Sequence, residues 1–269
     1  MNAIYMSIIC IIIIFLSTTI GSAFVFFFKK NFGPKINNIV LGFAGGIMIA
    51  ASIFGLILPS IDQSKEFYSS ISFIPPVIGF ILGGLLLWGI DKLVPHIHKN
   101  QESQVEEGIS TKKISNNFKF FLAVTIHNIP EGLSVGFACG LAIAGMNTGD
   151  ESILMYSALS LTIGIAIQNI PEGAAVSIPM LGEGISKPKS FLFGMSSGIV
   201  EPIFAIIGLF LAQLSIVTPW LLSFAAGAMI YVTLDEILPE ARKGGFEHFG
   251  IWAFMIGFAI MMLLEVIPF

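Results

Sequence analysis

Long apolar runs separated by short polar stretches dominate the sequence. A helix that crosses a membrane needs about 20 consecutive, mostly apolar residues. Eight stretches meet this requirement, at residues 4–28, 37–59, 74–94, 118–144, 153–180, 190–212, 219–238 and 250–267. The pattern predicts an all-α, polytopic membrane protein in which residues 1–269 form a single domain of eight transmembrane helices.

Composition supports a membrane location. Hydrophobic residues make up 55% of the chain and charged residues only 11%, whereas soluble domains carry about 25% charged residues. The net charge of −4 offers no basic surface for nucleic acid. The first apolar run begins near Tyr5 without a preceding basic segment, so we expect a retained helix and not a cleaved signal peptide.

The basic residues predict the orientation of the chain. If the N-terminus lies outside, every Lys and Arg except Lys65 falls on the inner side of the membrane. Cytoplasmic loops carry such an excess of basic residues. We therefore expect a multi-pass protein of the cell membrane with both termini outside. The longest polar stretch, residues 96–117, is then a cytoplasmic loop.

Two pairs of similar segments suggest an internal repeat. The sequence HNIPEG at 127–132 returns as QNIPEG at 168–173. A weaker pair, LGFAGGIMIA from Leu41 and LSFAAGAMIY from Leu222, shares the pattern F-A-x-G-x-M. In each pair the two helices run in opposite directions, so the chain is predicted to contain inverted-topology repeats, as many transporters do.

The paired motif carries groups that bind metal. His127 and Glu131 are four residues apart and share one face of a helix, and Gln168 and Glu172 repeat this spacing. Imidazole, carboxylate and amide oxygen suit Zn²⁺ and other first-row divalent ions. At 1.5 Å per residue, both sets lie roughly 12–20 Å from the inner helix ends, near the bilayer midplane.

The residues that follow these ligands shape the expected site. Pro130 and Pro171 remove a backbone donor each, and we expect a kink there. Gly132 and Gly173 are expected to open room for an ion beside the kinks.

Glu201 adds a third acid deep in the membrane, next to a proline. Each such charge costs about 2.5–3.5 kcal/mol at the centre of a helix on insertion scales. A bound cation, protonation or a water-filled path would offset this cost. The alternative is a set of protonated carboxylates that are hydrogen-bonded within a helix bundle.

The succession of HNIPEG and QNIPEG in an eight-helix chain resembles the ZIP (Zrt/Irt-like) family, and most of all its GufA-like bacterial branch. The resemblance implies a binuclear metal centre between the 118–144 and 153–180 helices. It assigns to the first position Met48, His127, Glu131, Gln168 and Glu172. It assigns to the second position Asn128, Glu131, Asn169, Glu172 and Glu201. Without the resemblance, Met48 is read as a packing residue, as a Met in an apolar helix usually is.

Further polar residues bracket the centre. Positions that resemble the cytoplasmic exit of the family are Asp91, His96, His98, Asp235, Glu236 and Glu240. Asp62 and Glu265, near the outer ends of two helices, could gather cations at an entrance. For both groups the simpler alternative is a solvated rim.

These observations predict a transporter and not an enzyme. The resemblance implies movement of Zn²⁺, with Fe²⁺, Mn²⁺, Co²⁺ and Cd²⁺ as further candidates, toward the cytoplasm. The metal is then cargo and no cofactor is expected, and the resemblance implies a homodimer. The alternatives are an intramembrane metal-dependent hydrolase and a metal-sensing receptor. The mirrored ligand sets and the bracketing clusters favour a transport path.

Overall fold

A computed structural model describes residues 2–27, 33–93, 96–100, 103–107, 116–146, 151–182 and 184–267. Almost all of these residues are helical. The α-helices are α1 (Ala3–Ala23), α2 (Pro34–Ala50), α3 (Leu58–Tyr68), α4 (Ile74–Leu93), α5 (Asn116–Gly145), α6 (Glu151–Gly182), α7 (Lys187–Ser197), α8 (Val200–Leu211), α9 (Thr218–Val232), α10 (Leu238–Glu240) and α11 (Glu247–Val266).

The prediction of a helical, multi-pass membrane protein is confirmed. Within the described part of the chain, six helical segments are long and apolar enough to cross a membrane. They are Ala3–Phe26, Pro34–Ile71, Ser152–Gly182, Lys187–Leu211, Thr218–Glu240 and Glu247–Val266. The first of them includes the short 3₁₀ segment η1 (Phe24–Phe26), and the second ends in another, η3 (Ser69–Ile71).

Two of the long helices contain a widened, π-helical stretch. The segment η2 (Ala51–Ile57) joins α2 to α3, and η4 (Thr233–Ile237) joins α9 to α10. Each stretch ends two residues before a proline, Pro59 or Pro239, whose ring lacks an N–H and crowds the preceding turn. The wider turn accommodates this crowding. Because the helix continues through η2, it extends to Tyr68, well beyond the end predicted near residue 59.

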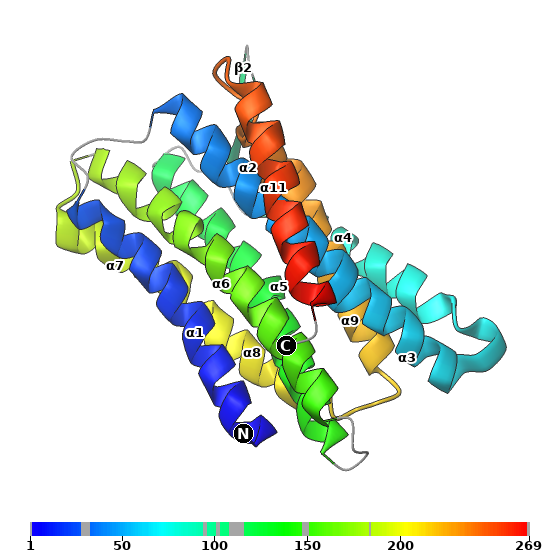
Figure 1. Cartoon of the computed structure of the whole chain (residues 1–269). Coiled ribbons are helices and arrows are strands. Elements are labelled where there is room, and N and C mark those ends of the chain that lie inside the picture. The colour runs from blue at the N-terminus through cyan, green and yellow to red at the C-terminus, as the bar shows by residue number, and fades with distance from the viewer. Residues whose placement is uncertain are drawn as a thin grey trace.

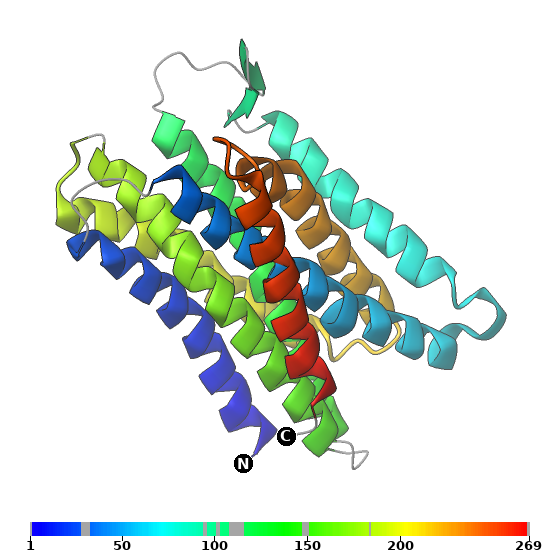
Figure 2. The ribbon, with the colours of Figure 1, turned by 45° about the horizontal axis from the view of Figure 1, so that its top comes forward.

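The long helices form two groups that lie side by side (Figures 1 and 2). In the first group, here called the α5–α6 bundle, α1 packs along α6, α5 packs along α8, and α5 contacts α6. In the second, the α2–α9 bundle, α2 packs along α11 and α4 packs along α9. Contacts of α2 with α6 and of α5 with α9 join the two bundles.

The outward surfaces of both bundles are apolar. Ile81 and Leu85 of α4, Phe210 of α8 and Trp252 of α11 are each more than half exposed. An apolar surface of this extent is unfavourable in water but is the normal exterior of a protein surrounded by lipid chains.

A small hairpin lies within the segment predicted as a cytoplasmic loop. Strands β1 (His96–Asn100) and β2 (Ser103–Glu107) pair antiparallel, with His96 opposite Glu107. Figure 2 shows the hairpin beyond the ends of α4 and α5. The placement of the whole 96–117 segment in the cytoplasm stays a prediction.

Candidate metal centre

The two halves of the repeated motif face each other across neighbouring helices. His127, Asn128 and Glu131 lie on α5, and Gln168 and its neighbours lie on α6. Both helices continue through their internal prolines. All seven polar candidates are buried, with His127 the most exposed at 8%. The buried candidates are His127, Asn128, Glu131, Gln168, Asn169, Glu172 and Glu201.

The motif glycines let helices approach closely. A Cβ atom at Gly132 would overlap the Glu201 carbonyl oxygen of α8, and a Cβ atom at Gly173 would overlap the Thr18 carbonyl oxygen of α1. Small residues permit such backbone contacts between membrane helices. The glycines thus serve helix packing, where we expected them to open room for an ion.

One hydrogen bond ties α5 to α6 in the middle of the motif. The Gln168 side-chain amide donates to Glu131 Oε1 over 2.6 Å. Both residues are fully buried. A hydrogen bond to a carboxylate in a low-dielectric interior is stronger than one in water, so this bond orients the Glu131 carboxyl group.

Glu201 receives three side-chain donors. Thr18 Oγ1 and Asn128 Nδ2 donate to its Oε1 atom, over 2.6 Å and 3.1 Å, and Asn169 Nδ2 donates to its Oε2 atom over 2.9 Å. Asn128 Nδ2 also donates to the Ser197 carbonyl oxygen over 2.9 Å. The two amide nitrogens therefore turn toward Glu201, which leaves the amide oxygens for another partner.

Several buried oxygen atoms around α5 and α6 accept no hydrogen bond. They are Asn128 Oδ1, Glu131 Oε2, Gln168 Oε1, Asn169 Oδ1, and Oε1 and Oε2 of Glu172. Leaving one buried acceptor unsatisfied costs about 1–3 kcal/mol, so a bound cation, water or protonation of the carboxyl groups has to offset the cost of this concentration of oxygen atoms. Among the described residues, no three His, Cys, Asp or Glu side chains are already gathered as a metal cage. A metal ion held here would therefore need amide oxygens to complete its ligand set.

Met48 of α2 is also buried, at 1% exposure. Its sulfur accepts a hydrogen bond from Thr233 Oγ1 of η4 over 3.7 Å. Met229 of α9 accepts one from Ser134 Oγ of α5 over 3.3 Å. Met229 occupies the position of Met48 in the second F-A-x-G-x-M segment. Sequence reasoning did not select it, although the register of the repeat was the signal that could have found it.

The structure brings one predicted exit residue to the centre itself. Glu236 Oε1 of η4 lies 3.3 Å from His127 Nε2. Both side chains are largely buried, since the Glu236 side chain is 17% exposed and the His127 side chain is 9% exposed. We had placed Glu236 at the inner surface, because a regular helix ending near residue 238 would put it there. Glu236 instead lies within the π-helical turn η4 and contacts His127.

The other predicted path residues are placed less centrally. Asp235 is half-buried beside Glu236, and Glu240 forms an ion pair with Lys243. The side chains of Asp91, His96 and His98 lie outside what the structure describes.

The two entrance candidates differ from each other. Asp62 is exposed and pairs with Lys65 at 2.9 Å. Glu265 is half-buried, and its Oε1 atom has no hydrogen-bond partner. Of the two, Glu265 therefore has a buried carboxylate oxygen without a partner, while Asp62 lies at the surface.

Comparison with known proteins gives consistent matches. A family model described as ZIP zinc transporter matches residues 104–265. The chain is 33% identical to zinc transporter ZIPB of Bordetella bronchiseptica, over 88% of this chain and 73% of the relative. It is 32% identical to zinc transporter GufA of Myxococcus xanthus, over 88% and 87% of the two chains. It is 29% identical to human zinc transporter ZIP11, over 93% of each chain.

Proposed function

The chain belongs to the ZIP zinc transporter family, and on this premise we propose that it carries divalent metal cations, chiefly Zn²⁺, across the membrane toward the cytoplasm. Fe²⁺, Mn²⁺, Co²⁺ and Cd²⁺ are further candidate cargoes. The observation that carries the proposal is the set of buried, unpaired oxygen atoms between α5 and α6. The metal is the substrate of this process, and the named relatives favour transport over the hydrolase alternative.

The centre is proposed to have two positions. His127, Gln168 and Met48 would serve the first, and Asn128, Asn169 and Glu201 the second, with Glu131 and Glu172 shared. The hydrogen bonds support this division, since Asn128 and Asn169 both turn toward Glu201, while Gln168 turns toward Glu131. Neutral amide oxygens bind divalent ions less tightly than carboxylates do, so the second position is expected to be the weaker one.

The exit path is proposed to begin at Glu236. Its contact with His127 places an acid of η4 directly against a ligand of the first position. π-helical turns inside α-helices frequently occur at functional sites. An ion released from His127 would meet Glu236 first, with Asp235 next to Glu236 and Glu240 one turn further along the same helix.

Eight transmembrane helices are proposed, with α4 and α5 added to the six apolar segments. Reciprocal glycine contacts support the inverted repeat. A Cβ atom at Gly46 would overlap the Phe254 carbonyl oxygen, and one at Gly227 would overlap that of Phe80. Gly46 and Gly227 are equivalent in the F-A-x-G-x-M segments. Thus α2 packs on α11 through Gly46 in the same way as α9 packs on α4 through Gly227.

A second glycine pair repeats the relation. A Cβ atom at Gly83 would overlap the Phe224 carbonyl oxygen, and one at Gly257 would overlap that of Phe43. Phe224 and Phe43 begin the two F-A-x-G-x-M segments. Ser52 and Thr233, four residues after the equivalent methionines, each donate to the carbonyl oxygen of that methionine over 2.8 Å. The pairing of α1 with α6 and of α8 with α5 fits the same symmetry.

The test is metal flux into liposomes that contain the purified protein and no organic substrate. We expect time-dependent uptake of radiolabelled Zn²⁺ that unlabelled competing ions reduce. Protein-free liposomes and liposomes that hold a Glu131→Ala variant serve as controls. Uptake equal to that of protein-free liposomes would overturn the proposal.

The location of both termini outside the cell and the homodimer stay predictions. Protease accessibility can test the first, and mass measurement in detergent can test the second.

A further inference from the structure

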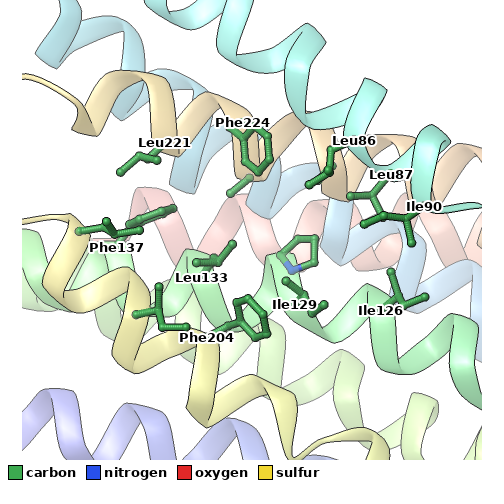
Figure 3. Close-up of a pocket in the computed structure, with 15 residues that line it drawn as sticks. Leu86, Leu87, Ile90, Ile126, Ile129, Leu133, Phe137, Phe204, Leu221 and Phe224 are labelled. Carbon is green, nitrogen blue, oxygen red and sulfur yellow. The ribbon is translucent and has the colours of Figure 1, made fainter.

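An apolar cavity of about 290 Å³ lies where the two bundles meet, between α4, α5, α8 and α9. Its lining residues are all apolar. Figure 3 shows Leu86, Leu87 and Phe224 on one side of it, facing Leu133, Phe137 and Phe204 on the other. The first three belong to the α2–α9 bundle and the last three to the α5–α6 bundle. The cavity thus separates the two bundles beside Pro130 of the metal-binding motif.

Water is a poor occupant for this space. A buried water molecule needs two to four polar partners, and dry apolar cavities of roughly 150 Å³ bind molecules such as benzene instead. This cavity is larger than that and offers hydrocarbon on every wall. A flexible hydrocarbon matches both its size and its chemistry.

The cavity is continuous with the surface that faces lipid. Leu86 of α4 and Ile207 of α8 line it and are nevertheless 47% and 41% exposed, so they form its mouth. Their sequence neighbours Leu85 and Ile206 point outward, at 52% and 49% exposure, and do not line it. An acyl chain lying along this surface would therefore pass into the cavity without leaving an apolar environment.

We propose that the acyl chain of a membrane lipid inserts between α4 and α8 and fills this cavity. The chain packs against Leu133 and Phe137 of α5 and against Phe224 of α9. It occupies the gap between the two bundles on the side of the HNIPEG helix.

At the equivalent place in the proposed inverted repeat, the junction of α11 and α6, a protein side chain occupies the space between the helices. Leu87 follows Gly83 by four residues, as Met261 follows Gly257. Met261 is fully buried, and its sulfur fills the space that a side chain at Gly164 of α6 would take. Protein atoms close the junction of α11 and α6, while the junction of α4 and α5 is left for lipid.

The test uses a phosphatidylcholine that carries a photoreactive diazirine near the end of one acyl chain. The full-length protein is placed in nanodiscs of this lipid, irradiated and digested, and labelled residues are located by mass spectrometry. We expect adducts on the inner walls, at Leu133 and Phe137, which a lipid confined to the outer surface does not reach.

Two pairs of substitutions make the test specific. Leu86→Trp and Ile207→Trp narrow the mouth from opposite walls, and Leu85→Trp and Ile206→Trp add the same bulk on the neighbouring outward faces. We expect each mouth variant to lower labelling of the inner walls at least fivefold. The Leu85→Trp and Ile206→Trp variants should show inner-wall labelling close to that of the wild type. If one of the two mouth variants folds poorly, the other still tests whether the mouth controls labelling. The labelling pattern of the wild-type protein is a separate test that needs no variant.

Wild-type labelling restricted to the outer faces of α4 and α8 would overturn the proposal. So would inner-wall labelling that neither mouth variant reduces. The readout is a covalent lipid adduct and does not depend on metal flux. Failure of this inference can therefore be distinguished from failure of the proposed transport function.

Discussion

At the scale of single residues, the centre depends on oxygen atoms that the protein itself does not satisfy. Glu131 receives one amide donor on one oxygen and none on the other, and Glu172 receives none on either. Buried acids of this kind are costly in a membrane unless a cation, protonation or a water-filled path offsets their charge. The proposed metal centre rests on this arrangement of unpaired oxygen atoms.

Glu131→Ala is expected to lower Zn²⁺ uptake at least tenfold, because it removes an anionic ligand shared by both positions. Losing a ligand or its direct support typically lowers metal affinity about 10–100-fold. Glu66→Ala, which removes the same charge from an exposed site on α3, is the matched control. Uptake into proteoliposomes at equal protein content measures both. Normal uptake by a folded Glu131→Ala protein would remove Glu131 from the site.

Glu201→Gln is expected to empty the weaker metal position and leave the stronger one filled. The variant keeps the shape of the side chain but loses a charge, and its NH₂ group would face donors from Thr18, Asn128 or Asn169. Uptake should fall partially. Metal stoichiometry by mass spectrometry, in the same preparation as the flux assay, is the measurement. Loss of both ions together would mean that the centre acts as one unit.

Glu236→Gln is expected to reduce uptake about 10-fold, since outer partners of metal ligands contribute about that much to affinity. The Glu236 carboxylate lies against His127, and the neutral amide of the Gln variant would not supply its negative charge. Glu240→Gln, one turn further along and already paired with Lys243, should have little effect. An equal loss of uptake in both variants would argue for a diffuse acidic surface and against a specific role of Glu236.

At the scale of helices, most of the elements could be predicted, because apolar length and proline position are local properties. The stretches around 74–94, 118–144 and 250–267 match α4, α5 and α11 closely. The π-helical turns η2 and η4 could not be predicted, since they depend on how a proline is accommodated within a packed bundle. This is why the extension to Tyr68 and the inward position of Glu236 were missed.

Gly83→Ala is expected to lower the apparent melting temperature by several degrees. The added Cβ atom would overlap the Phe224 carbonyl oxygen, so α4 and α9 would have to separate. Overpacking typically costs about 1–3 kcal/mol. Gly84→Ala is the matched control, because a Cβ atom added there would lie 3.8 Å from the Gly227 carbonyl oxygen, an ordinary van der Waals contact. Thermal unfolding in detergent compares the two. Equal melting temperatures would count against close packing of α4 on α9.

At the scale of the whole molecule, sequence motifs predicted which residues form the candidate centre but not the contacts around it. HNIPEG and QNIPEG predicted which faces of α5 and α6 carry the candidate ligands, because helical spacing fixes the face. The partners from α1, α8 and η4 arise only when distant segments pack together. Thr18, which donates to Glu201, has no motif of its own and could not have been selected. The division into two bundles likewise depends on contacts between residues far apart in the sequence.

The junction of α6 and α11 offers a test of whether the two bundles move against each other during transport. Gly164 faces Met261 across this junction, one residue in each bundle. We expect the double variant Gly164→Cys/Met261→Cys to form a disulfide under oxidation and to stop Zn²⁺ uptake, because the bond joins the bundles in one arrangement. A thiol reductant should restore uptake, and each single variant should be insensitive to oxidation. Cross-linking is measured by thiol labelling in the same proteoliposomes. A fully cross-linked protein that transports at the uncross-linked rate would mean that ions pass without relative movement of the α5–α6 and α2–α9 bundles.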